Sequence, residues 1–235
     1  RCYRSPMIRS VLTVSSGTLA SRLLGFLRDA MIAALLGTGA VADAFLAAFQ
    51  LVNVARRLLS EGALNAALVP AWLRLRESGG AEAAAAFAGR VLGTISAALI
   101  AATLLIGVAM PPVLPVLAPG FSSETLQLAV TEARLMLPYL AFAGPAAVLL
   151  ALTSARGQFF LTAFSPLLFN IALIAVMIVL FIVPRDADTI AFVLATTVGI
   201  AGLLQLLVLV VRRGEHVATP LRISFDQEMR GFLAR

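Results

Sequence analysis

The chain has 235 residues, of which 60% are hydrophobic and 13% are charged, and its mean hydropathy is +0.98. A soluble domain is nearer half apolar and about a quarter charged, so this composition excludes an ordinary water-soluble fold. The net charge of +6 is carried by arginines spread between apolar blocks, which argues against nucleic-acid binding. We therefore expect an all-α integral membrane protein.

Six apolar blocks follow one another, each near or above the ~20 residues that a helix needs to cross a bilayer. They predict helices at about residues 10–36, 43–75, 82–110, 124–154, 164–183 and 189–211. Glycine-rich turns at residues 37–39 and 78–80 separate the first three blocks. Pro111 and Pro112 are expected to stop the third block, and Ser122 or Ser123 to cap the fourth. Pro138 and Pro145 predict kinks within the fourth block.

The arginines between the blocks predict the orientation. With a cytoplasmic N-terminus, the outside loops hold two arginines, Arg134 and Arg185, and the inside segments hold twelve, a strong positive-inside bias. The twelve are Arg1, Arg4, Arg9, Arg74, Arg76, Arg90, Arg156, Arg212, Arg213, Arg222, Arg230 and Arg235. We expect residues 1–9 to form a cytoplasmic extension, residues 10–215 a six-helix transmembrane lobe, and residues 216–235 a cytoplasmic, amphipathic interfacial segment.

Charged residues inside the first two predicted helices are the most informative feature. Arg22 and Asp29 are seven residues apart and share a helix face, whereas Arg28 points elsewhere. Gly25 between them is expected to permit a bend or a close helix approach. In the second helix a polar stripe recurs at helical spacing: Asn53, Arg56, Arg57, Ser60 and Glu61. The last arginine and the glutamate are four apart, which allows a local ion pair.

A charge at the bilayer centre costs about 2.5–3.5 kcal/mol, so these arginines must face a watery cavity, pair with acids or lie at the interface. An arginine-lined cavity predicts an anionic substrate such as a phosphate or diphosphate, because the guanidinium donates paired hydrogen bonds and stays charged. Structural pairing stays open, with Arg22 and Arg28 bonded to acids such as Asp29, Asp43 or Glu61. Snorkelling to the interface is a third interpretation, and Asp43 also fits a helix-capping role.

The sequence contains no enzymatic constellation. It has no Gly-rich phosphate loop, and its only histidine, His216, lies beyond the last apolar block. A single cysteine, Cys2, allows neither an internal disulfide nor a thiolate metal cluster. No cleavable signal peptide is expected, because the first block is charged. We expect a transporter rather than an enzyme, without a cofactor or a metal site.

Residues 21–70 read SRLLGFLRDAMIAALLGTGAVADAFLAAFQLVNVARRLLSEGALNAALVP. This stretch resembles the N-terminal signature of the MurJ/MviN lipid II flippases. The signature is approximately S-R-x-x-G-F-x-R-D, then G-x-G-x-x-x-D-A-F, then P-N-x-x-R-R-x-x-x-E-G-A. APGF at 118–121, LPY at 137–139 and GQFFLTAFSPLLFN at 157–170 agree with the family as well. Val52 departs from the pattern, since it stands where the family usually has proline.

The resemblance implies the fold of the multidrug/oligosaccharidyl-lipid/polysaccharide (MOP) exporters, which are built from two lobes. This chain would supply the first lobe, and the family's further site residue in helix seven would lie beyond Arg235. The family's cavity arginines carry over to Arg22, Arg28 and Arg56, and a further position of functional weight to Asp43. Asn53, Arg57 and Glu61 match the motif with less defined roles.

The resemblance also implies a function, which is translocation of lipid II from the inner to the outer leaflet by alternating access for cell-wall (peptidoglycan) synthesis. The expected partners are lipid II, an undecaprenyl-diphosphate-linked disaccharide peptide, and membrane lipids, with no nucleic acid. The expected full-length form is a monomer in the bacterial inner membrane, driven by the membrane potential or an ion gradient. The rivals are another MOP exporter, such as a polysaccharide-repeat flippase, and a non-transporting membrane scaffold. Cavity arginines argue against a cation-drug antiporter.

Overall fold

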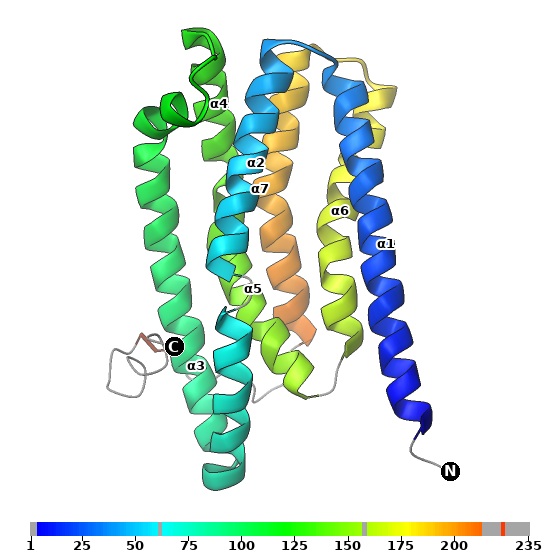
Figure 1. The fold of residues 1–235 in the computed structure, drawn as a ribbon, viewed down its shortest axis with the longest axis vertical. Helices are drawn as coiled ribbons and strands as arrows, with labels where there is room; N and C mark the ends of the chain where they lie inside the picture. The colour runs from blue at the N-terminus through cyan, green and yellow to red at the C-terminus, as the bar shows by residue number, and fades with distance from the viewer. Residues whose placement is uncertain (1–3, 61–62, 157–158, 213–221, 224–235) are drawn as a thin grey trace.

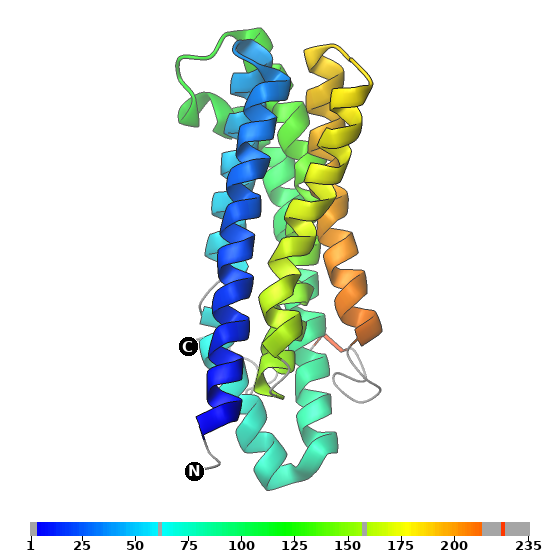
Figure 2. The ribbon, with the colours of Figure 1, turned by 90° about the vertical axis from the view of Figure 1, so that its right-hand side faces the viewer.

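The structure is a bundle of long helices that lie side by side (Figures 1 and 2). This computed structural model describes residues 4–60, 63–156, 159–212 and 222–223, with side chains at 15–55, 67–156, 167–211 and 222–223. Within these ranges the regular elements are all helices. They are α1 (Arg4–Leu36), α2 (Ala40–Ser60), α3 (Ala63–Leu117), α4 (Ser123–Met136), α5 (Pro138–Ala155), α6 (Phe159–Ile182) and α7 (Ala187–Arg212).

These helices make six passes along the bundle, because two of the passes each contain two helices and one helix folds back. The second pass is α2 followed by residues 63–79 of α3, and the fourth is α4 followed by α5 (Figure 1). Gly80 breaks α3 at φ 81° and ψ −175°, a conformation that glycine adopts freely, and the chain reverses there. The six predicted passes and the turn at residues 78–80 are confirmed.

Several predicted boundaries are wrong. The first block is longer than predicted, because α1 already includes residues 4–9. The second predicted block, residues 43–75, is helical on both sides of residues 61–62, which lie outside the described residues. Pro111 and Pro112 do not stop α3, which continues to Leu117. A proline at position 111 removes the N–H that would bond to the carbonyl of Gly107. Arg134 of α4 satisfies that carbonyl instead, with its Nε 2.9 Å from the oxygen.

Local capping explains the other ends. Gly37, with φ 65°, ends α1 as the sequence predicts. Ser122 accepts a hydrogen bond from the backbone N–H of Thr125 at 3.2 Å and caps α4. Pro138 divides α4 from α5, whereas Pro145 lies within α5. One predicted proline kink is therefore a helix break, and the other is absorbed by the helix.

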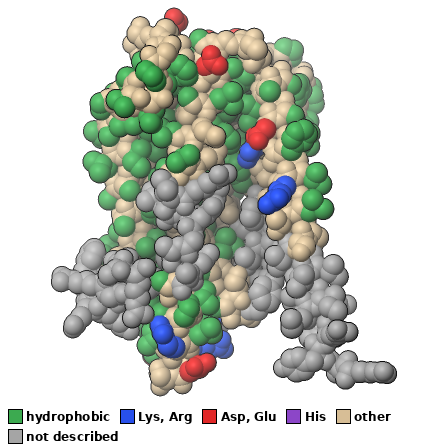
Figure 3. Space-filling view, in the orientation of Figure 1, with side chains coloured by type: hydrophobic (Ala, Val, Ile, Leu, Met, Phe, Trp, Pro, Cys, Tyr) green, Lys and Arg blue, Asp and Glu red, His purple; other side chains and the backbone are tan. Residues whose placement is uncertain are grey.

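The core lies between α2, α4, α5 and α7, while α1 packs mainly on α6. Small residues let α7 approach closely: a Cβ added at Gly199 would lie 2.5 Å from the carbonyl oxygen of Leu135. Large apolar side chains such as Phe26, Leu105 and Val116 are exposed. Much of the face in Figure 3 is hydrophobic. Its few charged side chains lie at the lower end of the α3 hairpin, on the side where α1 runs, and, as acids, near the upper end. Such a surface suits lipid rather than water.

Three helical stretches among the described residues are long and apolar enough to cross a bilayer: Ala67–Leu117, Ser123–Ala155 and Ala187–Val211. Two shorter apolar stretches, Ala40–Ala55 and Leu167–Ile182, accompany them. The predicted interfacial segment at residues 216–235 falls outside the described residues, apart from Arg222 and Ile223, which are exposed. The structure is therefore that of an all-α membrane protein.

Candidate functional site

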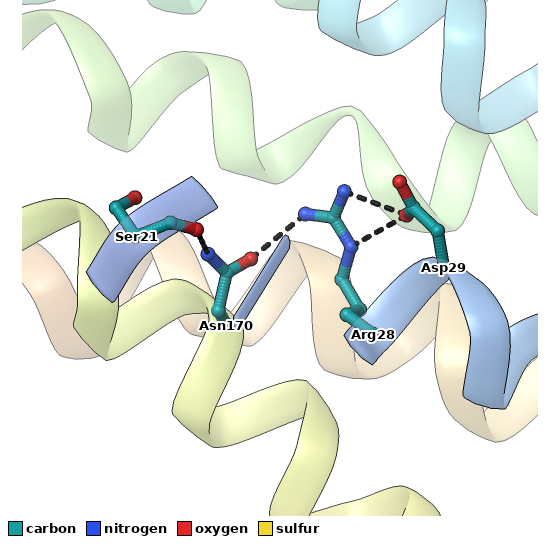
Figure 4. A network of polar contacts seen from close by, with 4 residues as sticks. All are labelled: Ser21, Arg28, Asp29 and Asn170. Carbon is teal, nitrogen blue, oxygen red and sulfur yellow. Dashed lines mark hydrogen bonds and ion pairs between the residues drawn. The ribbon is translucent and has the colours of Figure 1, made fainter. Parts of the chain in front are cut away.

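The intramembrane arginine of α1 lies in a polar network that joins α1 to α6 (Figure 4). The guanidinium of Arg28 donates to one carboxylate oxygen of Asp29, from Nη2 at 2.7 Å and from Nε at 2.9 Å. Its Nη1 donates to the side-chain oxygen of Asn170 on α6 at 2.9 Å. The Asn170 amide nitrogen in turn donates to the backbone carbonyl of Ser21 at 3.3 Å. One amide thus fixes both the arginine and the helix that carries it.

Aromatic rings surround the same guanidinium. Its Cζ lies 5.1 Å from the ring centroid of Phe49 on α2 and 5.7 Å from that of Phe169 on α6. Phe49 stacks on Phe45, with centroids 5.9 Å apart, and Phe169 contacts Tyr139 at 5.0 Å. A cation between aromatic faces gains about 0.5–2 kcal/mol, more as water is excluded. The rings therefore hold a charged group within an otherwise apolar core.

Burial differs sharply across the ion pair of Arg28 and Asp29. The arginine side chain is 15% exposed and the aspartate side chain is 61% exposed. The described bonds use three of the five N–H groups of the guanidinium. An anion that displaced the exposed carboxylate would meet a guanidinium that is already oriented by Asn170. Chemically, the site is an oriented cation at the edge of a helix bundle.

The other predicted residues do not join this network among the described residues. Arg22 and Asp29 are both exposed, while Arg28 is half-buried and bonded to Asp29. Asp43 is exposed in the first turn of α2, where a negative charge suits the helix dipole. Six residues separate it from Phe49, or about 9 Å along the helix axis. The structural pairing hypothesis therefore holds for Arg28 with Asp29 and is not seen for Arg28 with Asp43.

The polar stripe of α2 is described only in part. Asn53 is half-buried, one helical turn after Phe49. Arg56 and Arg57 lie within α2, but their side chains fall outside the described residues, as does Glu61 altogether. The predicted ion pair between Arg57 and Glu61 therefore stays a prediction. By helical register, position 56 follows Phe49 by seven residues and shares its face.

The sequence interpretation missed the residues that hold Arg28 in place. Asn170 is 5% exposed, and in the sequence it was noted only as the last residue of the family-like segment at 157–170. A buried asparagine in an apolar helix was the available signal, because such a group needs a partner. The role predicted for Gly25 is wrong as well, since α1 is continuous there and an added Cβ would meet only the Asn170 amide nitrogen, at an ordinary 3.9 Å.

Comparison with known proteins places this site in a family. Residues 32–235 match the family model described as "Lipid II flippase MurJ". The chain belongs to the MurJ lipid II flippase family. It is 37% identical over 205 residues to a probable lipid II flippase MurJ of Rhizobium tropici, covering 86% of this chain. It is 34% identical to the lipid II flippase MurJ of Burkholderia cenocepacia, again over 86% of the chain. The chain spans 38% and 39% of the length of these curated MurJ relatives.

Solved structures show the same MurJ-type architecture. The chain aligns with a lipid II flippase MurJ in an inward closed conformation at a TM-score of 0.70 and 22% identity, over 95% of this chain and 45% of that one. It also aligns with an outward-facing multidrug resistance transporter of the MATE family and MOP superfamily, at a TM-score of 0.62 and 17% identity. That match covers 95% of this chain and 50% of the other. At these identities the likeness concerns the fold alone, and it agrees with the expected all-α architecture of six passes.

Proposed function

We propose that this chain is the first lobe of a lipid II flippase, which moves the lipid-linked cell-wall precursor from the inner to the outer leaflet. The observation that carries the proposal is the guanidinium of Arg28, held between two aromatic rings within a membrane bundle. Lipid II carries a diphosphate, and an oriented guanidinium is a suitable ligand for it. Membership of the MurJ family supplies the identity of the lipid.

The proposed mechanism is alternating access. This lobe and a second one would rock around a cavity that opens first to one face of the membrane and then to the other. Arg22 and Arg28, with Arg56 of α2, would bind the diphosphate and head group, while the lipid tail stays in the bilayer. Asp29 would hold Arg28 while the cavity is empty and yield to the substrate. In that cycle no bond of the substrate is made or broken, so the protein is a transporter.

The remaining site assignments are proposed on the family motif. Asp43, Asn53, Arg57 and Glu61 would line or support the substrate cavity. A second lobe outside this chain would complete it. Residues 10–215 would then form the lobe, and residues 1–9 an extension before it that includes the first residues of α1, from Arg4 on. Residues 216–235 would be an interfacial segment that leads to a seventh helix. The full-length protein would act as a monomer.

The arginines support a cytoplasmic N-terminus in the bacterial inner membrane. The start of α1, the α3 hairpin and the ends of α5 and α7 lie at one end of the bundle (Figures 1 and 2). Arg74, Arg76 and Arg156 belong to that end, whereas Arg185 lies in the α6–α7 connection at the other. Positive residues concentrate on the cytoplasmic side of membrane proteins, which would make the first end cytoplasmic.

Complementation tests the proposal. The full-length protein that contains this chain is expressed in bacteria depleted of their own lipid II flippase, and growth and lipid II export are measured. We expect the wild-type protein and Arg185→Ala to restore both, and Arg28→Ala to fail at normal abundance. A well-expressed wild-type protein that restored neither would refute the function. If Arg28→Ala lowered only the yield and left export per molecule intact, the scaffold interpretation would be correct for this residue.

A further inference from the structure

A buried acid in α4 lies outside the arginine site. The inward face of this helix repeats at helical spacing, and its other members are Thr125, Ala129, Ala133 and Met136. Glu132 belongs to the same face and is only 5% exposed. Its neighbours on the helix are fully buried apolar residues of the main core. A carboxyl group therefore stands at a position where the pattern calls for an apolar side chain.

The structure gives this carboxyl little support. Its Oε2 is buried and has no hydrogen-bond partner among the described residues. Arg134, two positions along, is directed to α3, where its Nε bonds to the carbonyl of Gly107. The ion pair between Arg28 and Asp29 lies on α1 and does not involve Glu132. Glu132 thus has no described base to neutralise it.

The charged groups on the helices packed around α4 do not compensate. α7 contributes Asp188 in its first turn, which has the same sign and acts on Glu132 electrostatically. α2 contributes the exposed Asp43 in its first turn, and carries Arg56 and Arg57 near its opposite end. α5 and residues 96–117 of α3 contain no charged residue. An ionised carboxylate buried without a partner costs several kcal/mol, so this group needs a cation.

A proton satisfies that need better than a metal ion. Hard cations take several oxygen ligands, typically six to eight for calcium. Among the described residues no three His, Cys, Asp or Glu side chains come together to hold a metal ion. A proton requires only the carboxyl itself, and the neutral acid is far cheaper to bury than the anion.

Glu132 also lies next to the break between α4 and α5. The break is at Leu137, followed by Pro138, about one and a half turns further on. Here α7 packs directly on the backbone, because an added Cβ at Gly199 would be 2.5 Å from the Leu135 carbonyl oxygen and one at Gly202 2.7 Å from a ring carbon of Tyr139. A charge on Glu132 would therefore bear on how α4 packs beside this junction of two helices.

We propose that Glu132 is a proton-binding site, and that its loading and release bias the packing at the α4–α5 junction and so couple a proton gradient to the motion of this lobe. The coupling half of the proposal rests on the flippase function. The proton-binding half does not, and it is measured without lipid II.

Infrared difference spectroscopy tests the site in the full-length protein in lipid nanodiscs. The C=O band of a protonated carboxyl is expected in the wild-type protein near neutral pH, and it is lost when the medium is made alkaline. Glu132→Gln removes the band, Glu132→Asp retains a shifted one, and the control Glu124→Gln, an exposed acid on the same helix, leaves it unchanged. A spectrum that Glu132→Gln does not alter overturns the proposal, and so does a band that added Na⁺ removes at constant pH.

Transport in proteoliposomes tests the coupling. For one proton per lipid, a gradient of one pH unit shifts the leaflet distribution of lipid II by up to about tenfold. We expect this shift in the wild-type protein and in Glu124→Gln, and its loss in Glu132→Gln, while flipping without a gradient persists. A wild-type protein that flips lipid II without any response to the gradient overturns the coupling. A wild-type protein that flips nothing speaks against the proposed function instead, and the infrared band then decides the proton site.

Discussion

Replacing Asn170 by alanine removes the hydrogen bond that ties Arg28 of α1 to α6. The bond is 2.9 Å long and joins residues 142 positions apart in the sequence. A hydrogen bond to a charged group contributes about 1.5–3 kcal/mol in soluble proteins. Between membrane helices, measured couplings are smaller, averaging about 0.6 and reaching about 1.7 kcal/mol, because the unfolded chain in the membrane also finds partners. We expect a coupling of about 1–2 kcal/mol here, near the upper end, because the donor is a guanidinium.

A double-mutant cycle measures this coupling. The free energy of unfolding of the full-length protein is determined for the wild type, Arg28→Ala, Asn170→Ala and the double variant. Asn53→Ala in place of Asn170→Ala is the control, since Asn53 is a half-buried amide of α2 with no described bond to Arg28. Independent sites add within about 0.5 kcal/mol. An Arg28–Asn170 cycle that was additive within that limit would refute the geometry in Figure 4.

Three further predictions follow from other parts of the molecule. Gly199→Ala should destabilise the protein by about 1–3 kcal/mol through overpacking, because the added Cβ would meet the backbone of α4. The control Gly25→Ala should be neutral or slightly stabilising. If denaturant titration gave the two variants equal stability, the close packing at Gly199 would be contradicted. Arg28→Lys should lose most lipid II export at normal abundance, since an ammonium cannot reproduce the planar fork between two rings, and wild-type export would show that charge alone suffices. The pKa of Asp186 is lowered, first by the hydrogen bond from the backbone N–H of Thr189 and second by the hydrogen bond from the Thr189 hydroxyl. The ionised Asp186 cap therefore stabilises the fold at pH values above the ordinary pKa of 3.8, and this stabilisation is lost as the pH falls through the lower pKa of the folded state. Asp186→Asn should therefore lower the melting temperature at neutral pH, and the difference from wild type should shrink in acid; a constant difference would mean that the charge of this cap contributes nothing.

Local features of the chain were sufficient for the fold class. Apolar blocks of spanning length and glycine turns at residues 37–39 and 78–80 depend only on neighbouring residues, and they gave six passes. The misplaced end at Pro111 shows the limit of this reasoning. The carbonyl that the proline frees is satisfied by Arg134, a residue of the next pass. A propensity rule based on one helix does not include such a partner.

The sequence alone determined that this protein lies in a membrane and that its chain makes six helical passes. It also determined that the first two helices carry the intramembrane charges, and which family the chain resembles. These properties follow from composition, spacing and a motif within fifty consecutive residues (21–70). Only the tertiary structure decided that Arg28 is held by Asn170 and two phenylalanine rings, and that the Oε2 of Glu132 is buried with no partner among the described residues. Both outcomes depend on which helices lie side by side. The physical reason is that a buried charge is stabilised or left unpaired by groups that approach it through space, whatever their distance along the chain.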